Sequence, residues 1–221
     1  MLIGFWHNIL LLISMIETQL DSAIPPQDEG GMSDTVASRA FDDERTAQNA
    51  FSLLLQRFIA VEQWHQYAGW GTADFILTDG NGVPINRNVQ EGDHFRINIP
   101  APGNTEGDGY DWVKVEKILH AEEENGEGYL IRVRPANNPQ DPETEVSHFF
   151  SDEATSSFII RRIGNTIYAE VHGRNEHANT DEVGFIDKAR NAIVALFAKT
   201  AFSKFQWKSL VDGLLDFETS E

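Results

Sequence analysis

The sequence predicts an α+β fold: an antiparallel sheet or small barrel of about six strands, covered by one N-terminal helix and one or two C-terminal helices. Three observations predict it. A helical period precedes residue 70, an alternating period fills residues 72–172, and a helical period returns after residue 185. Short turns rather than helices join the alternating segments, and this favours antiparallel pairing. Because the apolar face of such a sheet must be covered, we expect residues 32–221 to form a single domain.

The N-terminal helix is predicted between Asp43 and Tyr67, where apolar side chains recur at three- and four-residue spacing. Asp42 or Asp43 can cap its start, and Gly69 is suited to end it. The stripe that would face the core consists of Ala47, Phe51, Leu54, Phe58 and Val61.

The middle of the chain contains six segments predicted to be strands, and in the second, third, fourth and sixth of them apolar and polar residues alternate, as in half-buried strands. They are residues 72–78, 95–99, 113–116, 129–134, 157–163 and 167–172. Turn residues that tolerate positive φ lie between several of them. Two longer polar loops, residues 100–109 and 135–145, could lie over a binding face.

Two apolar stripes predict the C-terminal helices, one in residues 185–197 and one in residues 207–215. We expect them to cover the sheet. The alternative is that the aromatic and basic segment 202–208 lies on a membrane or in a groove of a partner. This order of elements resembles that of helix-grip folds, in which a curved antiparallel sheet wraps a C-terminal helix around a cavity. It is also similar to that of small barrel domains with helical flanks.

Residues 1–31 are predicted to be an extension outside the domain core. Residues 1–16 are mostly apolar, but they are shorter than a bilayer span of roughly 20 residues and carry no Lys or Arg for a secretory signal. A targeting or membrane-associating segment is the alternative. Our hypothesis is that translation begins at Met32, which opens an ordinary soluble start.

Composition and charge exclude several classes of function. The 221 residues carry 17 Lys and Arg against 35 Asp and Glu, a net charge of −18, which argues against broad binding to nucleic acid or anionic membrane. The absence of cysteine excludes disulfides, thiolate metal sites and a cysteine nucleophile. It also fits a reducing compartment, and we predict a cytoplasmic protein.

The densest polar cluster of the chain lies in residues 168–177. Glu170 and His172 lie one pleat apart on the same face of a predicted strand, where a carboxylate can orient an imidazole as a base. With Tyr168 they form the candidate catalytic set; a solvated strand face is the alternative, and the one we favour. His172 and His177 are five residues apart and would point to opposite faces, so we predict no metal site and no cofactor.

Basic residues occupy the polar positions of several predicted strands and could together form an anion-binding patch. The alternative is cross-strand pairing with Glu116 and Glu170. The candidate ligand-binding residues are Arg96, Lys114, Arg132 and Arg134, with Arg161 as a further member.

Phe149 and Phe150 are candidates for contact with a partner, although a place in the core is the simpler interpretation. No phosphate-binding loop, dinucleotide fingerprint, nucleophile elbow or HExxH motif is present. We therefore predict a soluble, acidic, non-enzymatic binding or interaction module, for an unknown protein or a small anionic ligand. One alternative is a helix-grip-like ligand-binding protein or enzyme with a pocket between sheet and C-terminal helix. Another is a subunit of a larger assembly, including an oligomer of this chain.

Overall fold

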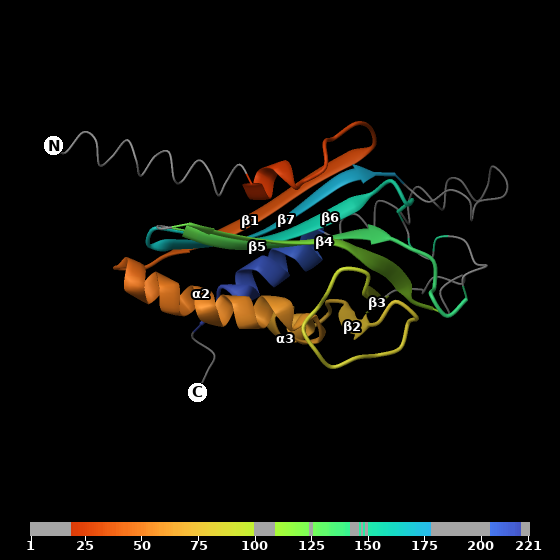
Figure 1. Ribbon diagram of the computed structural model, residues 1–221, viewed down its shortest axis with the longest axis horizontal. Coiled ribbons are helices and arrows are strands. Elements are labelled where there is room, and N and C mark those ends of the chain that lie inside the picture. The colour runs from red at the N-terminus through yellow and green to blue at the C-terminus, as the bar shows by residue number, and fades with distance from the viewer. Residues whose placement is uncertain are drawn as a thin grey trace.

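The computed structural model describes residues 19–99, 109–123, 126–141, 146, 148, 150–177 and 204–217. These residues form an antiparallel sheet of seven strands in the order β1-β7-β6-β5-β4-β3-β2. Helices cover one side of the sheet, and a short N-terminal segment lies on the other (Figure 1). The α+β class and the antiparallel sheet are therefore confirmed. The strands are β1 Gly31–Ala40, β2 Asp74–Thr78, β3 His94–Asn98, β4 Asp111–Glu123, β5 Gly126–Pro135, β6 Thr155–Ile163 and β7 Thr166–Glu176.

The sheet is open, because β1 pairs only with β7 and β2 only with β3 among the described strands. The barrel alternative is thus wrong, and so is the count of six strands. All six predicted segments are strands, and the seventh, β1, was not predicted. Its side chains alternate only between exposed and half-buried, and most are small or polar, so β1 lacks the apolar alternation that marks the other strands.

The predicted N-terminal helix follows β1 and is interrupted. Helix α2 spans Glu44–Ile59 and begins as expected, with the Asp43 side chain accepting a hydrogen bond from the Thr46 amide. Ala60 leaves the helical region, and a 3₁₀ turn at Val61–Gln63 leads into α3 at Trp64–Ala68. The single continuous helix was therefore a wrong prediction. The break turns Trp64 inward, where its indole N–H donates to the Phe58 carbonyl at 3.0 Å.

Aromatic rings occupy the space between the sheet and the helices. Trp64 is fully buried, and its ring centroid lies 4.8 Å from that of Phe158 on β6 and 5.4 Å from that of Phe75 on β2. Trp207, from the C-terminal helix, adds an edge contact to Phe158 at 5.2 Å. Burying rings of this size supplies a large share of the hydrophobic stabilisation of the domain.

The described part of the C-terminal helix, residues 204–214, packs on the domain's own sheet, as predicted. Leu210, Val211, Leu214 and Leu215 are buried in the main core. Arg57 of α2 donates to the carbonyl oxygens of Leu214 and Asp216 just beyond the helix, at 3.2 and 2.5 Å. The predicted stripe in residues 185–197 lies outside the described residues.

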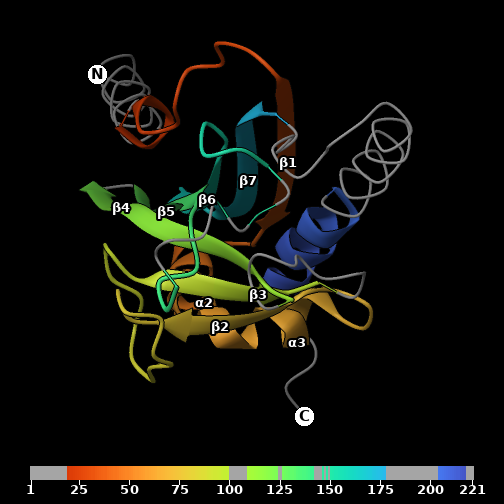
Figure 2. The ribbon, with the colours of Figure 1, turned by 90° about the vertical axis from the view of Figure 1, so that its right-hand side faces the viewer.

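The segment that precedes β1 packs on the opposite face of the sheet. Leu20 and Ala23 are buried in a small second cluster with side chains of β4, β5 and β6. Figure 2 shows this short helical segment above β4 and β5, away from the main helical layer. Whether the native chain begins at Met1 or at Met32 stays a prediction.

Two further predictions concern loops and membranes. Residues 100–108 lie outside the described part, whereas Gln140 of the second loop donates to the Gly82 carbonyl at 3.0 Å and so packs on the turn after β2. Among the described helices, none combines the length and apolarity that crossing a bilayer requires.

Candidate functional site

The predicted catalytic residues lie on the outer face of β7, away from the helices. Tyr168, Glu170 and His172 alternate along the strand with Ile167, Ala169 and Val171, which pack in the core. Glu170 and His172 are nevertheless buried, because β1, β6 and the N-terminal segment surround them.

His172 lies between two carboxylates. Its Nδ1 is 2.6 Å from Asp34 Oδ1 on β1, and its Nε2 is 2.9 Å from Glu170 Oε2 on β7. Asp34 and His172 are direct partners in the β1–β7 register. Two ionised carboxylates accept hydrogen bonds but donate none, so satisfying both requires an N–H on each ring nitrogen, which is the imidazolium form.

Two arginines extend this arrangement, which we call the β1–β7 ion network: Asp21, Asp34, Arg161, Glu170, His172 and Arg174. Arg161 donates to Asp21 at 2.7 Å and to Glu170 at 3.1 Å. Arg174 forms an ion pair with Asp34 at 2.8 Å. Three carboxylates are thus balanced by two guanidinium groups and one imidazolium, and such balance is what a largely buried charge cluster requires.

The pKa values agree with this arrangement. Burial lowers the pKa of His172, but hydrogen bonds to Glu170 and Asp34 outweigh it, so the pKa lies above its ordinary value. For Asp34 burial raises the pKa, and the hydrogen bonds from His172 and Arg174 outweigh it and lower the pKa. Both shifts favour the charged forms, and the charged His172 of β7 and Asp34 of β1 attract each other across the two strands.

This geometry bears on acid–base chemistry. Because both nitrogens of His172 face carboxylates, neither is directed at a substrate in this arrangement. Tyr168 lies opposite Arg161 and Ser38 in the strand register, on the same outer face. The catalytic roles of Tyr168, Glu170 and His172 stay a prediction, and the contacts favour a structural ion network.

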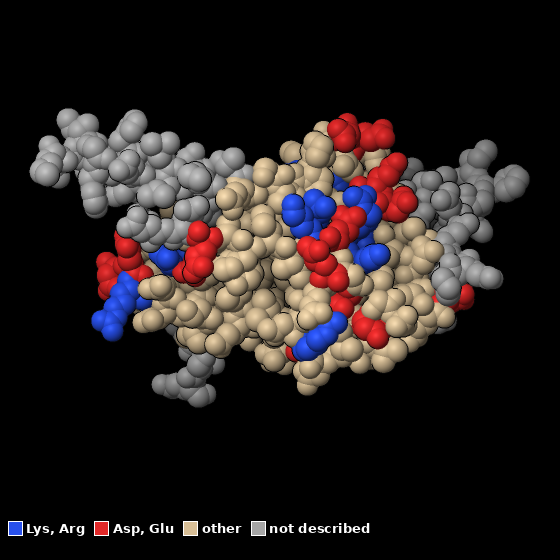
Figure 3. Space-filling view, viewed as in Figure 1, with Lys and Arg blue, Asp and Glu red and all other residues tan. Residues whose placement is uncertain are grey.

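The predicted anion-binding residues do not gather into an open cationic patch. Arg132 and Arg134 of β5 share the Glu116 carboxylate, at 3.1 and 2.5 Å, and Arg96 of β3 lies over the Tyr110 ring at 4.7 Å. Lys114 is exposed and opposite Arg134 in the register. On the face seen in Figure 3, basic and acidic side chains lie side by side without a broad basic area. These contacts favour the cross-strand pairing alternative.

Of the two candidate partner-contact phenylalanines, the structure describes Phe150 alone. Phe150 is buried, with 7% of its surface exposed, and its amide donates to His148 Nδ1 at 3.0 Å. Phe149 lies outside the described residues. The prediction of a partner contact there stays untested.

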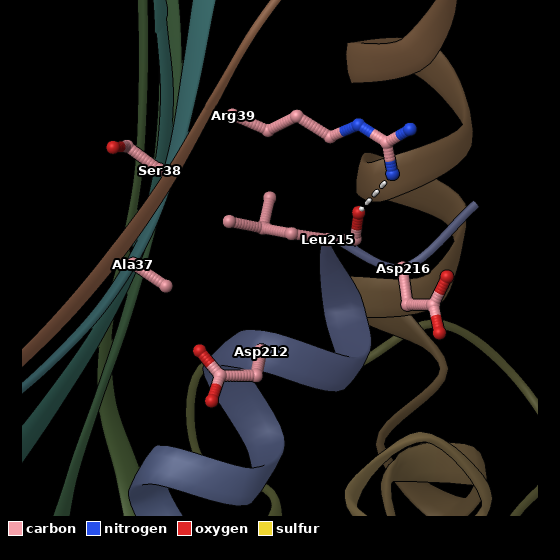
Figure 4. A pocket seen from close by; sticks show the side chains of 6 residues that line it. All are labelled: Ala37, Ser38, Arg39, Asp212, Leu215 and Asp216. Atoms are coloured by element: carbon pink, nitrogen blue, oxygen red, sulfur yellow. Dashed lines mark hydrogen bonds between the residues drawn. The ribbon is translucent and has the colours of Figure 1, made fainter. Parts of the chain in front are cut away.

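An open groove that the sequence did not predict lies between β1 and the C-terminal helix. It has a volume of about 370 Å³. Ala37 and Arg39 reach from β1 toward the helix, and Ser38 points away (Figure 4). Figure 2 shows β1 at the end of the sheet with the helix beside it. The lining residues are Ala37, Ser38, Arg39, Asp212, Leu215 and Asp216.

The outer face of β1 is also open. Val36 and Met32 are 52% and 58% exposed, and no described strand pairs with the second edge of β1. Sequence reasoning missed both the groove and this edge because it did not recognise β1 as a strand. The one local signal was Val36, a β-branched residue next to Thr35 in a short segment of small and polar residues, and it is weak.

Comparison with known proteins identifies no family. No family model matches the chain, and no curated protein matches it in sequence. Among solved structures, hypothetical protein jhp0584 from Helicobacter pylori is 10% identical, with a TM-score of 0.46 over 87% of this chain and 92% of that one. Ara h 8.0201 is 10% identical, with a TM-score of 0.32 over 81% and 99%. The protein of unknown function SA2116 from Staphylococcus aureus is 9% identical, with a TM-score of 0.33 over 84% and 95%.

Proposed function

We propose that this protein is a binding module that takes an extended, positively charged segment of a partner protein along the free edge of β1. The observation that carries the proposal is a ten-residue strand at the edge of the sheet with an open groove beside it. Proteins normally shield long edge strands, because their unpaired amides and carbonyls can pair with another chain. An edge strand beside a helix is also a known way of binding extended peptides.

Both faces of β1 offer positions for a partner's side chains. A strand added to β1 would place alternate side chains beside Val36 on the outer face and in the groove beside Ala37 on the inner face. Ala37 leaves space there, and Leu215 forms an apolar wall. Main-chain hydrogen bonds would supply affinity, and these two positions would supply selectivity.

Charge favours a basic partner. The protein carries a net charge of −18, and much of its basic complement is held by its own carboxylates. The groove is lined by Asp212 and Asp216 on its helical wall and by Arg39 on β1, and Asp212 forms an ion pair with Lys208, so the attraction rests mainly on the net charge of the whole chain. The negative electrostatic potential of such a chain attracts cationic segments and raises their association rate.

A second candidate is a small ligand in the same groove, as in the helix-grip alternative. The volume of about 370 Å³ falls within the usual range for ligand pockets, although the groove is open. Tyr168, Glu170 and His172 are not among its lining residues, so such a ligand would be bound rather than transformed by them.

A selection experiment tests the proposed function. A phage library of random decapeptides is selected on the full chain, and the selected peptides are measured by calorimetry against Val36→Lys and Val83→Lys. Both valines are 52% exposed, so the two variants add the same charge at equal exposure, but only Val36 lies on β1. We expect Lys- or Arg-containing peptides of alternating pattern whose affinity falls at least about tenfold with Val36→Lys, equivalent to about 1.4 kcal/mol, and is unchanged with Val83→Lys.

Hydrogen exchange provides the second measurement, with protection expected in the amides of β1. Peptides that lose affinity equally with both variants would contradict the proposal, as would a selection that yields no binder. A ligand that keeps its affinity for Val36→Lys but loses it with Ala37→Leu, which fills the groove, would favour the second candidate.

A further inference from the structure

Three metal-ligating side chains from distant segments converge at one end of the sheet. Glu29 belongs to the segment before β1, Glu153 to the turn before β6, and His177 follows β7. One ligand atom from each lies within 4.8 Å of the other two. None of the three belongs to the β1–β7 ion network or to the groove.

His177 has a nitrogen that is buried without a partner. Its Nε2 is inaccessible and accepts or donates no hydrogen bond within the described part of the chain. Gly30 lies close to this ring at φ 77°, and a Cβ at this position would lie 2.8 Å from Nε2. An unpaired buried nitrogen is costly, and a bound ion would satisfy it.

The backbone around each ligand is held by specific hydrogen bonds. Asn175 Oδ1 accepts from the Asp28 and Glu29 amides at 2.9 and 3.3 Å, which fixes the start of the site. The Ser151 amide donates to the His177 carbonyl at 3.0 Å. The turn that carries Glu153 is therefore tied to the same strand end, so the backbone of all three ligand residues is held in place before any ion arrives.

We propose that Glu29, Glu153 and His177 bind a divalent transition-metal ion, with Zn²⁺ as the best fit. One imidazole nitrogen and two carboxylate oxygens form a mixed donor set that Zn²⁺ accepts, with bonds of about 2.0–2.2 Å and a further position open to water. Two carboxylates with a neutral imidazole carry the charge that one divalent ion neutralises. Ca²⁺ fits less well, since it takes six to eight oxygen ligands.

The ion would tie the segment before β1 to the end of β7. Ligand atoms bound to one tetrahedral Zn²⁺ lie about 3.3 Å apart, and those of the three residues lie within 4.8 Å of one another, so the exposed Glu29 and Glu153 side chains need to close in by no more than about 1.5 Å. His172 takes no part in this site, in agreement with the expectation that His172 and His177 point to opposite faces. The other two ligands come from different segments of the chain. The site requires Glu29, so a chain that begins at Met32 would lack it.

Calorimetric titration of the full chain with ZnCl₂ tests the proposal. We expect one Zn²⁺ per chain for wild type, and at least about tenfold weaker binding for the double variant Glu29→Gln/Glu153→Gln. Both glutamates are exposed, so the double variant should fold normally. The matched control is Asp28→Asn/Asp152→Asn, which removes two exposed carboxylates from the same two segments and should bind like wild type.

Ring-nitrogen NMR locates the ion independently. Zn²⁺ should shift the ring-nitrogen resonances of one histidine, and these resonances should be missing from the spectrum of His177→Ala. Ca²⁺ should leave the resonances of all histidines unchanged. Equal Zn²⁺ affinity of wild type and the Glu29/Glu153 variant would overturn the proposal. So would the lack of binding to wild type at about 1 mM Zn²⁺.

Discussion

At the scale of single residues, His172 is the group that connects the edge strand to the rest of the sheet by charge. Its imidazolium lies between Asp34 of β1 and Glu170 of β7. Arg174 contacts the same Asp34 oxygen as His172, and Arg161 contacts both oxygens of Glu170. Removing one member of such a cluster leaves a buried charge uncompensated. The stability of the β1–β7 pairing should therefore depend on the protonation of His172.

Raising the pH should destabilise the protein through His172. Because its folded pKa lies above the ordinary value of 6.5, its stabilisation is fully present below about pH 6.5 and is lost as the pH rises through the folded pKa. His172→Gln should abolish this decline and lower the free energy of unfolding by about 3 kcal/mol in the acidic range. Urea unfolding at a series of pH values measures both effects.

The titration of His94 affects stability with the opposite sign, so its contribution must be separated from that of His172. Burial, reinforced by Lys114, lowers the pKa of His94, so this residue reduces stability as the pH falls below its ordinary value. The difference between wild type and His172→Gln isolates the contribution of His172. Parallel pH profiles for these two proteins would show that His172 is neutral in the folded state.

At the scale of elements, the C-terminal helix is docked by close backbone approach as well as by its apolar stripe. A Cβ at Gly213 would lie 1.9 Å from the Tyr67 carbonyl oxygen of α3, so only glycine permits this contact. About two turns earlier on the same helix, the Gln206 side chain accepts a hydrogen bond from the Ala73 amide at 2.7 Å. The helix is thereby held against α3 and the start of β2.

Gly213→Ala should destabilise the protein, although glycine to alanine within a helix ordinarily stabilises by about 1 kcal/mol. The added methyl must push the helix away from α3, and overpacking of this kind costs about 1–3 kcal/mol. We expect a lower urea midpoint with an unchanged denaturant dependence. Ser209→Ala on the same helix is the control and should change stability by less than about 0.5 kcal/mol. A more stable Gly213→Ala protein would contradict the observed contact.

At the scale of the whole molecule, the open sheet and the net charge of −18 act in opposite directions on association. The edge of β1 that no described strand pairs with can accept another strand, but two copies of so acidic a chain repel each other. A basic partner meets no such barrier. The molecule is therefore expected to bind a different protein more readily than a second copy of itself.

Size-exclusion chromatography with light scattering should show a single species of 24.8 kDa at micromolar concentration. Its mass should not change with Val36→Lys, because no second copy occupies β1. A dimer that Val36→Lys dissociates would mean that the edge pairs with itself. The proposed basic partner would then be wrong, and the oligomer alternative would gain support.

Local pattern explains why so much of the sheet and the first helix could be predicted. Strands β3, β4, β5 and β7 contain the apolar alternation that burial of one face requires. Asp43 has a side chain suited to cap a helix, and Gly69, which lacks a side chain, adopts the positive φ that ends α3. The break at Ala60 was missed because it is stabilised by the packing of Trp64 on Phe75 and Phe158, and the spacing of apolar residues along the sequence does not reveal such long-range contacts. Strand β1 was missed because an edge strand needs no buried alternation.

The candidate sites likewise contain features that the sequence determines and features that only the tertiary structure decides. The sequence by itself determined that Glu170 and His172 share a face, because the period of a strand is two residues. Only the tertiary structure decided that Asp34 completes the ion network, that Glu116 holds Arg132 and Arg134, and that His177 meets Glu29 and Glu153. Periodicity acts over a few residues, whereas these partners lie between 16 and 148 positions apart and are brought together by the register of the folded sheet and by the segments that flank its strands.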